Sequence, residues 1–230
     1  MKELEFLHKD FFSPKKYKQM VKSYQEKDDP TGWFDKVYES AQGDYTKVFW
    51  ADLEPSAYLI KWLKQNHIKK ANKKACVIGC GVGDDAQALS DFGFDVIAFD
   101  ISKKAIDLCK NRYPNSKVDF TVANLFDFPK DWFENFDVVY ECNTIQVLLG
   151  NYRKEAKKAM CSLVAKDGYI LVSCRSAKEE DEKKDEIPKP LLKSEIDEFK
   201  TTYKLKEKSF LAYDDNQTPS IPHFFAVYQK

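Results

Sequence analysis

The chain has 230 residues, of which 43% are hydrophobic and 14% aromatic, so it can form one large domain with an N-terminal extension. Its 37 basic residues balance its 37 acidic residues, which disfavours a nucleic acid or an anionic membrane as the main partner. No apolar run approaches the roughly 20 residues of a membrane span, and the N-terminus lacks the apolar core of a signal peptide. We therefore expect a cytoplasmic protein that is a monomer or a homodimer.

The six cysteines are scattered through the chain, form no Cys-x-x-Cys pair, and are accompanied by only three histidines. This spacing fits neither a zinc site nor a disulfide framework, so we expect reduced thiols and no metal site.

The first 70 residues are expected to form helices rich in aromatic side chains. Residues 31–42 (TGWFDKVYESAQ) are predicted to be a short helix, and residues 50–66 a longer one with Pro55 in its first turn. Four apolar side chains recur at helical spacing in the second of these: Tyr58, Leu59, Trp62 and Leu63.

From Lys74 onward, strand and helix patterns alternate. Short apolar runs predict strands at residues 74–79, 95–100, 118–124, 136–142 and 169–174. Helices are expected at 84–92, 102–113 and 152–165, with Gly93 ending the first and Ser102 capping the second. This succession is typical of a parallel sheet with helices on both faces.

The C-terminal part begins with a charged stretch, residues 176–190, that is predicted to be a solvated loop. A short helix at 193–200 follows. Two strand-like runs, 203–213 and 223–230, are separated by turn residues, so they are predicted to form an antiparallel hairpin at the edge of the sheet.

Three glycines, Gly79, Gly81 and Gly83, stand at every second position where the first strand passes into a helix. Glycines there clear side chains from the unpaired N–H groups of the helix end, so a ligand can approach the bare backbone. The dinucleotide fingerprint is spaced differently, as G-x-G-x-x-G, and the adjacent Asp84 and Asp85 would repel a pyrophosphate. They would tolerate a zwitterionic or cationic ligand without phosphate, such as S-adenosylmethionine.

The ends of the next two strands offer groups that suit a nucleoside. Asp100, at the end of the second strand, can accept hydrogen bonds from both ribose hydroxyls. After the third strand, Asn124 can reach the edge of adenine, and Leu125 or Phe126 can pack on its face. The Asp100 interaction would serve NAD equally well.

Five motifs in order, VIGCGVGDDAQAL, FDVIAFDIS, VANLFDFP, FDVVYECNTIQVL and DGYILV, resemble those of class I S-adenosylmethionine-dependent methyltransferases over residues 74–175. The resemblance implies an α/β, Rossmann-like, doubly wound sheet of seven mostly parallel strands with an antiparallel C-terminal strand. It places the glycine loop under the methionine part of the cofactor, Asp100 at the ribose and Asn124 at the adenine, although the family usually has Asp at this last position. The cofactor-binding residues implied for the core are Gly79, Cys80, Gly81, Gly83, Asp100, Ile101, Asn124, Leu125, Phe126 and Glu141.

The N-terminal segment, with TGWFDKVYE and VFWADLEPSAYLIKWL, resembles the entry segment of the thiopurine and thiol/halide methyltransferase group. That likeness implies a helical lid over residues 1–70 and a methyltransferase core over 71–230. Trp33 and Trp50 would line the lid at the cofactor, and Asp52 would lie near the methyl-donor pocket. The alternative for both tryptophans is that they are simply the hydrophobic faces of packed helices.

Methyl transfer from a sulfonium is an in-line displacement whose chief demand is positioning, and a soft nucleophile such as a thiolate needs no base. Glu141 and Asp52 are the candidate catalytic groups. For Glu141 two roles are open, a general base or a partner of the methionine ammonium, and we favour the second. We expect a small-molecule methyltransferase with a thiol-type acceptor, and O- or N-methylation as alternatives. An NAD-dependent oxidoreductase and a non-catalytic cofactor-binding protein are the rival interpretations.

Overall fold

The computed structural model describes residues 14–230 except 28, 30, 67–72 and 179–186. The first 13 residues and residues 67–70 of the expected lid lie outside the described residues, as does most of the predicted 176–190 loop.

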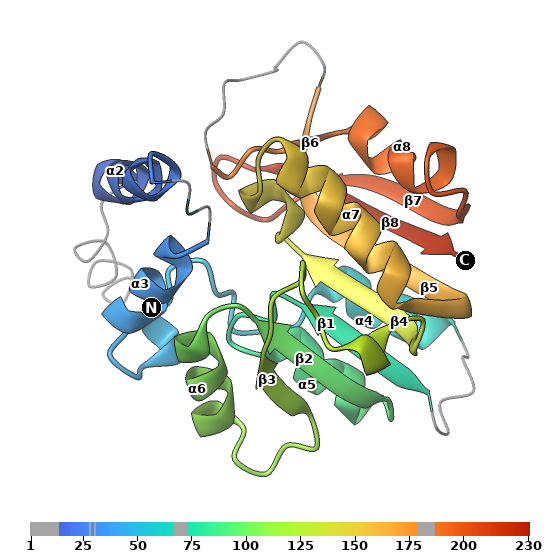
Figure 1. The fold of residues 1–230 in the computed structure, drawn as a ribbon, viewed down its shortest axis with the longest axis horizontal. Helices are drawn as coiled ribbons and strands as arrows, with labels where there is room; N and C mark the ends of the chain where they lie inside the picture. Colours follow the sequence, from blue (N-terminus) through green and yellow to red (C-terminus); the bar gives the residue numbers. More distant parts are fainter. Residues whose placement is uncertain (1–13, 28, 30, 67–72, 179–186) are drawn as a thin grey trace.

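A twisted sheet with strand order β3-β2-β1-β4-β5-β8-β7 forms the centre of the molecule (Figure 1). Five strands are parallel, while β8 runs antiparallel to both β5 and β7. A short strand, β6, pairs with β5 outside this path, so the sheet has one strand more than the seven expected. The strands are β1 (Lys74–Ile78), β2 (Asp95–Asp100), β3 (Asp119–Val122), β4 (Phe136–Cys142), β5 (Val164–Ala177), β6 (Leu191–Leu192), β7 (Lys206–Asp214) and β8 (Pro222–Gln229). The predicted architecture, including the C-terminal hairpin, is confirmed.

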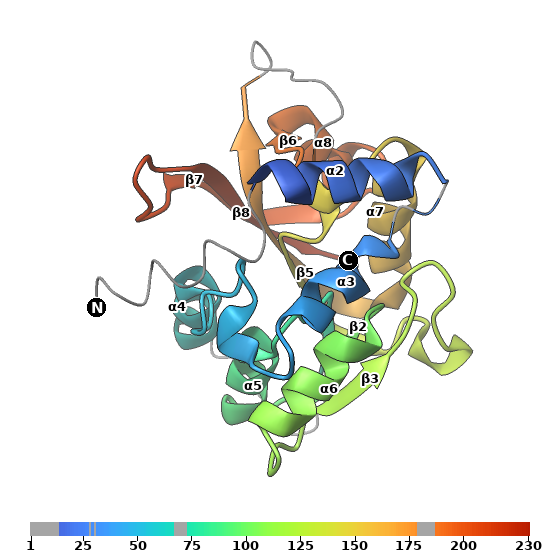
Figure 2. The same ribbon diagram turned by 90° about the vertical axis from the view of Figure 1, so that its left-hand side faces the viewer.

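Helices cover both faces of the sheet because each presents one apolar side to it. On one face lie α4 (Ala57–Gln65), α5 (Asp84–Asp91) and α6 (Lys103–Arg112). On the other lie α7 (Asn151–Leu163) and α8 (Lys193–Thr201), and the two sides are seen in Figure 2. Gly93 ends α5 with a φ of +92°, and the Ser102 hydroxyl caps α6 by accepting from the Ala105 N–H, both as predicted.

The N-terminal segment lies across the C-terminal ends of the parallel strands. It comprises α2 (Pro14–Gln25), α3 (Trp33–Ser40) and the short η1 (Tyr45–Lys47). Helix α3 packs against α6 through Tyr38 and Ala105, whereas α2 packs against Val147 and Ile187 near the ends of β4 and β5. The segment therefore bridges two separate edges of the core.

Among the boundaries that differ from those predicted, two have a clear structural cause. The helix expected over 50–66 begins at Ala57, because the Ser56 side chain caps it, and Pro55 lies before the cap rather than in the first turn. Strand β5 starts at Val164, inside the range predicted for the preceding helix, and a register shift in its pairing with β4 accommodates Asp167 in a left-handed conformation.

Candidate functional site

The glycine loop between β1 and α5 is the centre of the candidate site. Gly79, Gly81 and Gly83 all have left-handed backbones, with φ of +60°, +57° and +94°. A Cβ on Gly79 would lie 2.5 Å from the Thr144 Oγ1, and one on Gly83 would lie 3.1 Å from the Phe120 ring. At Gly81 the nearest atom is the Tyr38 hydroxyl, 3.5 Å away. Two of the glycines thus admit neighbouring protein groups, and the middle one faces the N-terminal segment.

Asp100, at the end of β2, lies beside this loop as predicted. One of its carboxylate oxygens accepts from the Gly81 N–H at 3.2 Å and the other from the Ser102 N–H at 2.9 Å. The side chain is buried, and desolvation raises its pKa to about 6, while these two backbone hydrogen bonds act in the opposite direction. The carboxylate is therefore fixed in place with lone pairs available to hydroxyl donors.

The two acids that follow the loop do not face a ligand, so the argument that they would repel a pyrophosphate was wrong. Asp84 forms an ion pair with Arg112 at 2.5 Å that ties α5 to α6. The carboxylate of Asp85 accepts from the Ser56 N–H at 2.7 Å and so anchors the start of α4. Arg112 neutralises the charge of Asp84, and the Ser56 N–H occupies an oxygen of Asp85. Both partners are distant in the sequence, so the local sequence did not reveal them.

An open groove of about 550 Å³ lies between the ends of β2 and β3 and begins at Ile101, the residue after Asp100. Ile101 and Asn124 line it, and Asn124 uses its side-chain oxygen to accept from the Phe126 N–H at 2.9 Å. Leu125 is buried in the core below the groove, so its side chain supports the site from beneath. Phe126 is 37% exposed and contacts the Tyr152 ring at a centroid distance of 5.6 Å.

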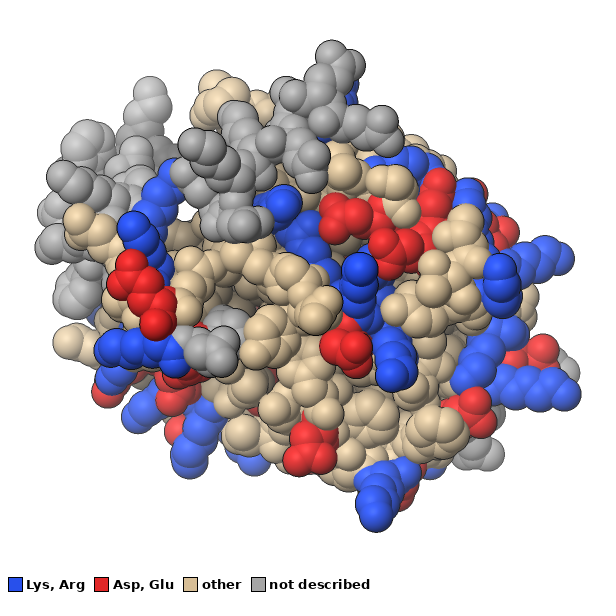
Figure 3. All heavy atoms as spheres, turned by 45° about the horizontal axis from the view of Figure 1, so that its top comes forward, with Lys and Arg blue, Asp and Glu red and all other residues tan. Residues whose placement is uncertain are grey.

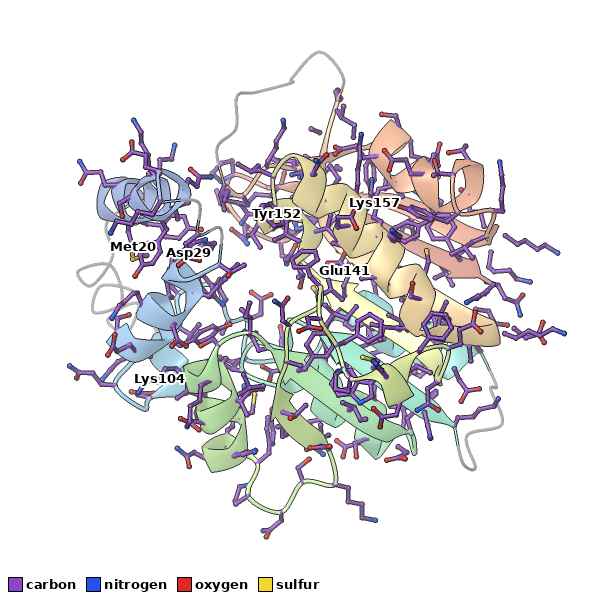
Figure 4. The ribbon with its side chains drawn as sticks, in the orientation of Figure 1. Met20, Asp29, Lys104, Glu141, Tyr152 and Lys157 are labelled. Atoms are coloured by element: carbon purple, nitrogen blue, oxygen red, sulfur yellow. The ribbon has the colours of Figure 1, made fainter. Side chains whose placement is uncertain are left out.

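Glu141 is buried at the end of β4, close to the glycine loop (Figure 4). Its Oε2 accepts from the N–H groups of Thr144 at 2.9 Å and Ile145 at 3.2 Å, whereas its Oε1 has no hydrogen-bond partner. Burial raises the pKa of this carboxyl to about 8, so the group is mostly protonated at neutral pH. A protonated carboxyl is a poor general base, which argues against the catalytic role considered for Glu141.

Some aromatic side chains of the N-terminal segment lie in its own interior, and others lie on the side that faces the glycine loop. Trp33 is fully buried among its neighbours and stacks on Phe34 at a centroid distance of 3.9 Å, so it belongs to the core of the segment itself. Trp50 is partly exposed and contacts Tyr38 edge-on at 5.4 Å. Tyr38 in turn covers the glycine loop at Gly81. Among these aromatic side chains of the N-terminal segment, Tyr38 is therefore the one at the loop, and the sequence analysis did not select it.

Asp52 lies on the exposed connection between Trp50 and α4. Partial burial raises the pKa of its carboxyl, and the negative charges of Glu54 and Asp215 add to this effect. It is thus separate from Asp100 and Glu141 and stands near the outer part of the N-terminal segment.

Cys80, in the glycine loop, has its pKa raised by a hydrogen bond with Cys109 and by burial, so its thiol is neutral.

Comparisons with known proteins agree with this geometry. The family described as "Methyltransferase domain" matches residues 76–172. No curated protein sequence matches the chain significantly.

The described residues contain no group of side chains that could hold a metal ion, and no helix among them is long and apolar enough to cross a membrane.

Several solved structures share the fold. One is a Burkholderia thailandensis 1,6-didemethyltoxoflavin-N1-methyltransferase with bound S-adenosylhomocysteine, 13% identical, with a TM-score of 0.65 over 86% of this chain and 87% of that chain. A second, reported for the conversion of a disulfide bond into a thioacetal group during echinomycin biosynthesis, is 17% identical, with a TM-score of 0.64 over 79% and 83% of the two chains. A third, a Methanosarcina mazei SAM-dependent methyltransferase, is 15% identical, with a TM-score of 0.62 over 77% and 98%.

The described residues fit S-adenosylmethionine on structural grounds. The left-handed glycine loop places no side chain of its own at Gly81, the Asp100 carboxylate is held by two backbone N–H groups one residue before the groove-lining Ile101, and Glu141 has an unsatisfied buried oxygen. The sequence predicted Asp100 and Glu141 for this region. It missed Tyr38, Thr144 and Asp35, because nothing local marks residues whose importance comes from contacts across the fold.

Proposed function

We propose that this chain, whose residues 76–172 match the methyltransferase-domain family, transfers the methyl group of S-adenosylmethionine to the sulfur atom of a small molecule. When bound, the sulfonium cofactor supplies an activated methyl group. The chain's own task is then to hold the acceptor in line with the methyl group and to exclude water. When the nucleophile is a thiolate, the chain does not need to remove a proton from it.

The main support for the proposal is that the titratable side chains at the end of β4 are mostly uncharged at neutral pH. Glu141 is mostly protonated at neutral pH, and burial also raises the pKa values of Tyr140 and Cys142. Tyr140 and Cys142 are therefore not ready bases, and Glu141 either keeps its proton or, when ionised, pairs with the methionine ammonium of the bound cofactor. An acceptor that loses its proton in solution, as a thiol does, suits such surroundings better than an alcohol, whose proton must be removed at the site.

The roles of the remaining residues follow from their positions. In this proposal the loop from Gly79 to Gly83, including Cys80, receives the methionine part of the cofactor, and Asp100 the ribose. The groove lined by Ile101 and Asn124 receives the adenine, with Leu125 and Phe126 beside it. Residues 1–70 act as a lid on the 71–230 core, with Tyr38 and Trp50 as its inner aromatic side chains. Asp52 lies on the acceptor side.

A small acceptor agrees with the charge distribution. On the face shown in Figure 3, basic and acidic side chains are interspersed and form no extended patch of one sign. Two of the structural neighbours were reported with small-molecule chemistry, one at nitrogen and one at a disulfide, so N-methylation is the second candidate. The aromatic lid favours an acceptor that is partly apolar, because such an acceptor displaces water from these rings.

The experiment is a panel assay that measures S-adenosylhomocysteine formed from S-adenosylmethionine. Simple thiols, phenols, amines and halides are offered at equal concentration, and Asp100→Asn provides the matched control for cofactor-dependent turnover. We expect turnover with at least one thiol and little with the matched phenol or amine. Turnover with amines or phenols alone would contradict the sulfur assignment. Binding without turnover across the panel would favour a non-catalytic protein.

A further inference from the structure

Three buried side-chain oxygens on β4 or directly after it have no hydrogen-bond partner within the described structure: the Tyr140 hydroxyl, Oε1 of Glu141 and Oδ1 of Asn143. Tyr140 packs in the hydrophobic cluster beneath α4 and α5, on the face of the sheet opposite to Glu141. Buried polar atoms are almost always paired, so an unpaired one needs an explanation. Here two acceptors without donors lie two residues apart on one strand end, which indicates that a donor-rich group belongs between or beside them.

The position of Glu141 relates these oxygens to the cofactor loop. In the sheet register Glu141 pairs with Ile78, the residue directly before Gly79. Its other oxygen, Oε2, holds the N–H of Thr144, whose hydroxyl donates to the Ile78 carbonyl and occupies the space next to Gly79. The free oxygen is therefore part of the same junction at which the proposed site receives the amino-acid end of S-adenosylmethionine.

Asn143 is held in an unusual conformation at the same junction. Its backbone is left-handed, with a φ of +60°, and its N–H donates to the Ser173 carbonyl at 2.8 Å. Asparagine tolerates this region better than most residues, yet it still costs energy relative to an extended strand. The strain is compatible with a side chain that is aimed at a ligand.

Burial keeps a proton on the free carboxyl. Desolvation raises the pKa of Glu141 to about 8, and the backbone N–H groups of Thr144 and Ile145 only partly oppose it. The titratable groups that interact with it from its own strand and from β5 are the thiols of Cys142 and Cys174, which are neutral because burial raises their pKa values. On the α7 side the two buried cations are paired, Arg153 with Glu195 and Lys157 with Glu198. A new positive charge would thus find no competing partner among these groups.

We propose that Glu141 and Asn143 accept hydrogen bonds from the α-ammonium group of the methyl donor, and that Glu141 releases its proton to the solvent when the donor binds. The ammonium keeps its three protons, the carboxyl O–H bond breaks, and the proton passes to water or buffer, so no other reactant is needed. Donor binding would consequently be coupled to pH near neutrality. This inference rests on the proposed cofactor site but not on the identity of the acceptor.

Calorimetric titration tests the coupling with two ligands. S-adenosylhomocysteine carries the α-ammonium, whereas 5′-methylthioadenosine lacks the whole amino-acid end and serves as the matched control. Each is titrated at pH 7.5 in two buffers with different ionisation enthalpies, and the difference in heat gives the number of protons released. Asp85 and Asp100, with pKa values of about 6, are already ionised at that pH, so neither of them is the source of a released proton.

We expect S-adenosylhomocysteine to release about three quarters of a proton at pH 7.5, since a group with a pKa of about 8 is protonated to that extent. The release should fall towards zero above pH 9, and 5′-methylthioadenosine should release none. In Glu141→Gln the release should vanish. Asn143→Gly, which keeps the left-handed backbone, should weaken S-adenosylhomocysteine at least fivefold and leave 5′-methylthioadenosine unchanged.

Two results would overturn the proposal. One is tight binding of S-adenosylhomocysteine to the wild-type protein with the same heat in both buffers. The other is equal proton release by both ligands, which would place its source away from the ammonium. The comparison of the two ligands on the wild-type protein still tests the proposal if Glu141→Gln does not fold. If S-adenosylhomocysteine does not bind at all, the cofactor site itself is wrong, and that failure is distinct from binding without proton release.

Discussion

The carboxylate of Asp35 on α3 accepts a hydrogen bond from the hydroxyl of Ser102, which caps α6 two residues after Asp100. The same carboxylate lies 3.4 Å from the Lys104 N–H. A side chain of the N-terminal segment is therefore bonded to the element that carries the proposed ribose ligand. This contact links the position of α3 to the start of α6, two residues from Asp100.

Asp35→Ala should weaken cofactor binding without disturbing the core. Loss of the hydrogen bond to Ser102 should reduce the affinity for S-adenosylhomocysteine by about 1 kcal/mol, or roughly fivefold. Glu39→Ala, on the exposed side of the same helix, is the control because it pairs only with Lys36. Calorimetry compares the two variants, and equal affinities would show that α3 does not influence the site.

Asp100→Asn tests the ribose assignment directly. The Gly81 and Ser102 N–H groups bind different oxygens of Asp100, so the amide oxygen can serve only one of them, and the side chain also loses its charge. We expect S-adenosylhomocysteine to bind more weakly by about 1.5–3 kcal/mol. Asp95→Asn, at the exposed start of the same strand, should bind like the wild type. Unchanged affinity in Asp100→Asn would mean that the ribose lies elsewhere.

Gly79→Ala should disrupt the site because of the contact with Thr144. The added Cβ would lie 2.5 Å from the Thr144 Oγ1, and the φ of +60° adds strain. Gly43→Ala, where φ is +83° and no atom lies within 4 Å, measures the effect of a positive φ without a side-chain contact. Cofactor affinity should fall far more in Gly79→Ala. Partial recovery in Gly79→Ala/Thr144→Ala would confirm the cause, and equal effects of the two single variants would refute it.

Glu141→Gln should change the pH dependence of stability in a defined direction. The folded-state pKa of about 8 exceeds the unfolded value, so the native protein holds a proton that the unfolded chain loses as the pH rises. The free energy of unfolding of the wild type therefore falls relative to that of the variant between about pH 4.5 and 8, by about 1.4 kcal/mol per pH unit. Urea denaturation at pH 5 to 9 measures this difference. A constant difference would show that Glu141 is not protonated in the native protein.

Arg153 on α7 should be a large contributor to stability. Its buried guanidinium donates to both Glu195 oxygens, to the Leu148 carbonyl at 2.7 Å and to the Lys189 carbonyl. Arg153→Met leaves Glu195 and these carbonyls without their donor and should cost about 3 kcal/mol. Lys154→Met, at an exposed position of the same helix, should change stability by less than about 0.5 kcal/mol. Similar unfolding midpoints in denaturant would contradict the role given to Arg153.

Much of the core was predictable because its signals are local. The Gly79–Gly83 loop follows a five-residue apolar strand, Ser102 precedes an amphipathic run, and Gly93 follows one. Each of these signals depends on backbone conformation within a few residues, so it can be read without knowing the tertiary contacts. The position of Asp100 at the end of its strand followed for the same reason.

The remaining features depend on contacts between distant segments. Asp84 has the same chemistry whether it faces a ligand or Arg112, which lies 28 residues away. Tyr38 became the ring over the loop because α3 packs on α6, and no spacing in the sequence fixes that docking. The start of α4 shifted to Ala57 because Ser56 bonds both to its own helix and to Asp85.

The most direct test of the account is the structure of the complex with S-adenosylhomocysteine. We predict that the ribose hydroxyls lie within hydrogen-bond distance of the Asp100 carboxylate, and that the homocysteine end lies over Gly81 with its ammonium at Glu141. A cofactor bound with its ribose away from Asp100, or a glycine loop still filled by Tyr38 with the ligand elsewhere, would contradict the central claim.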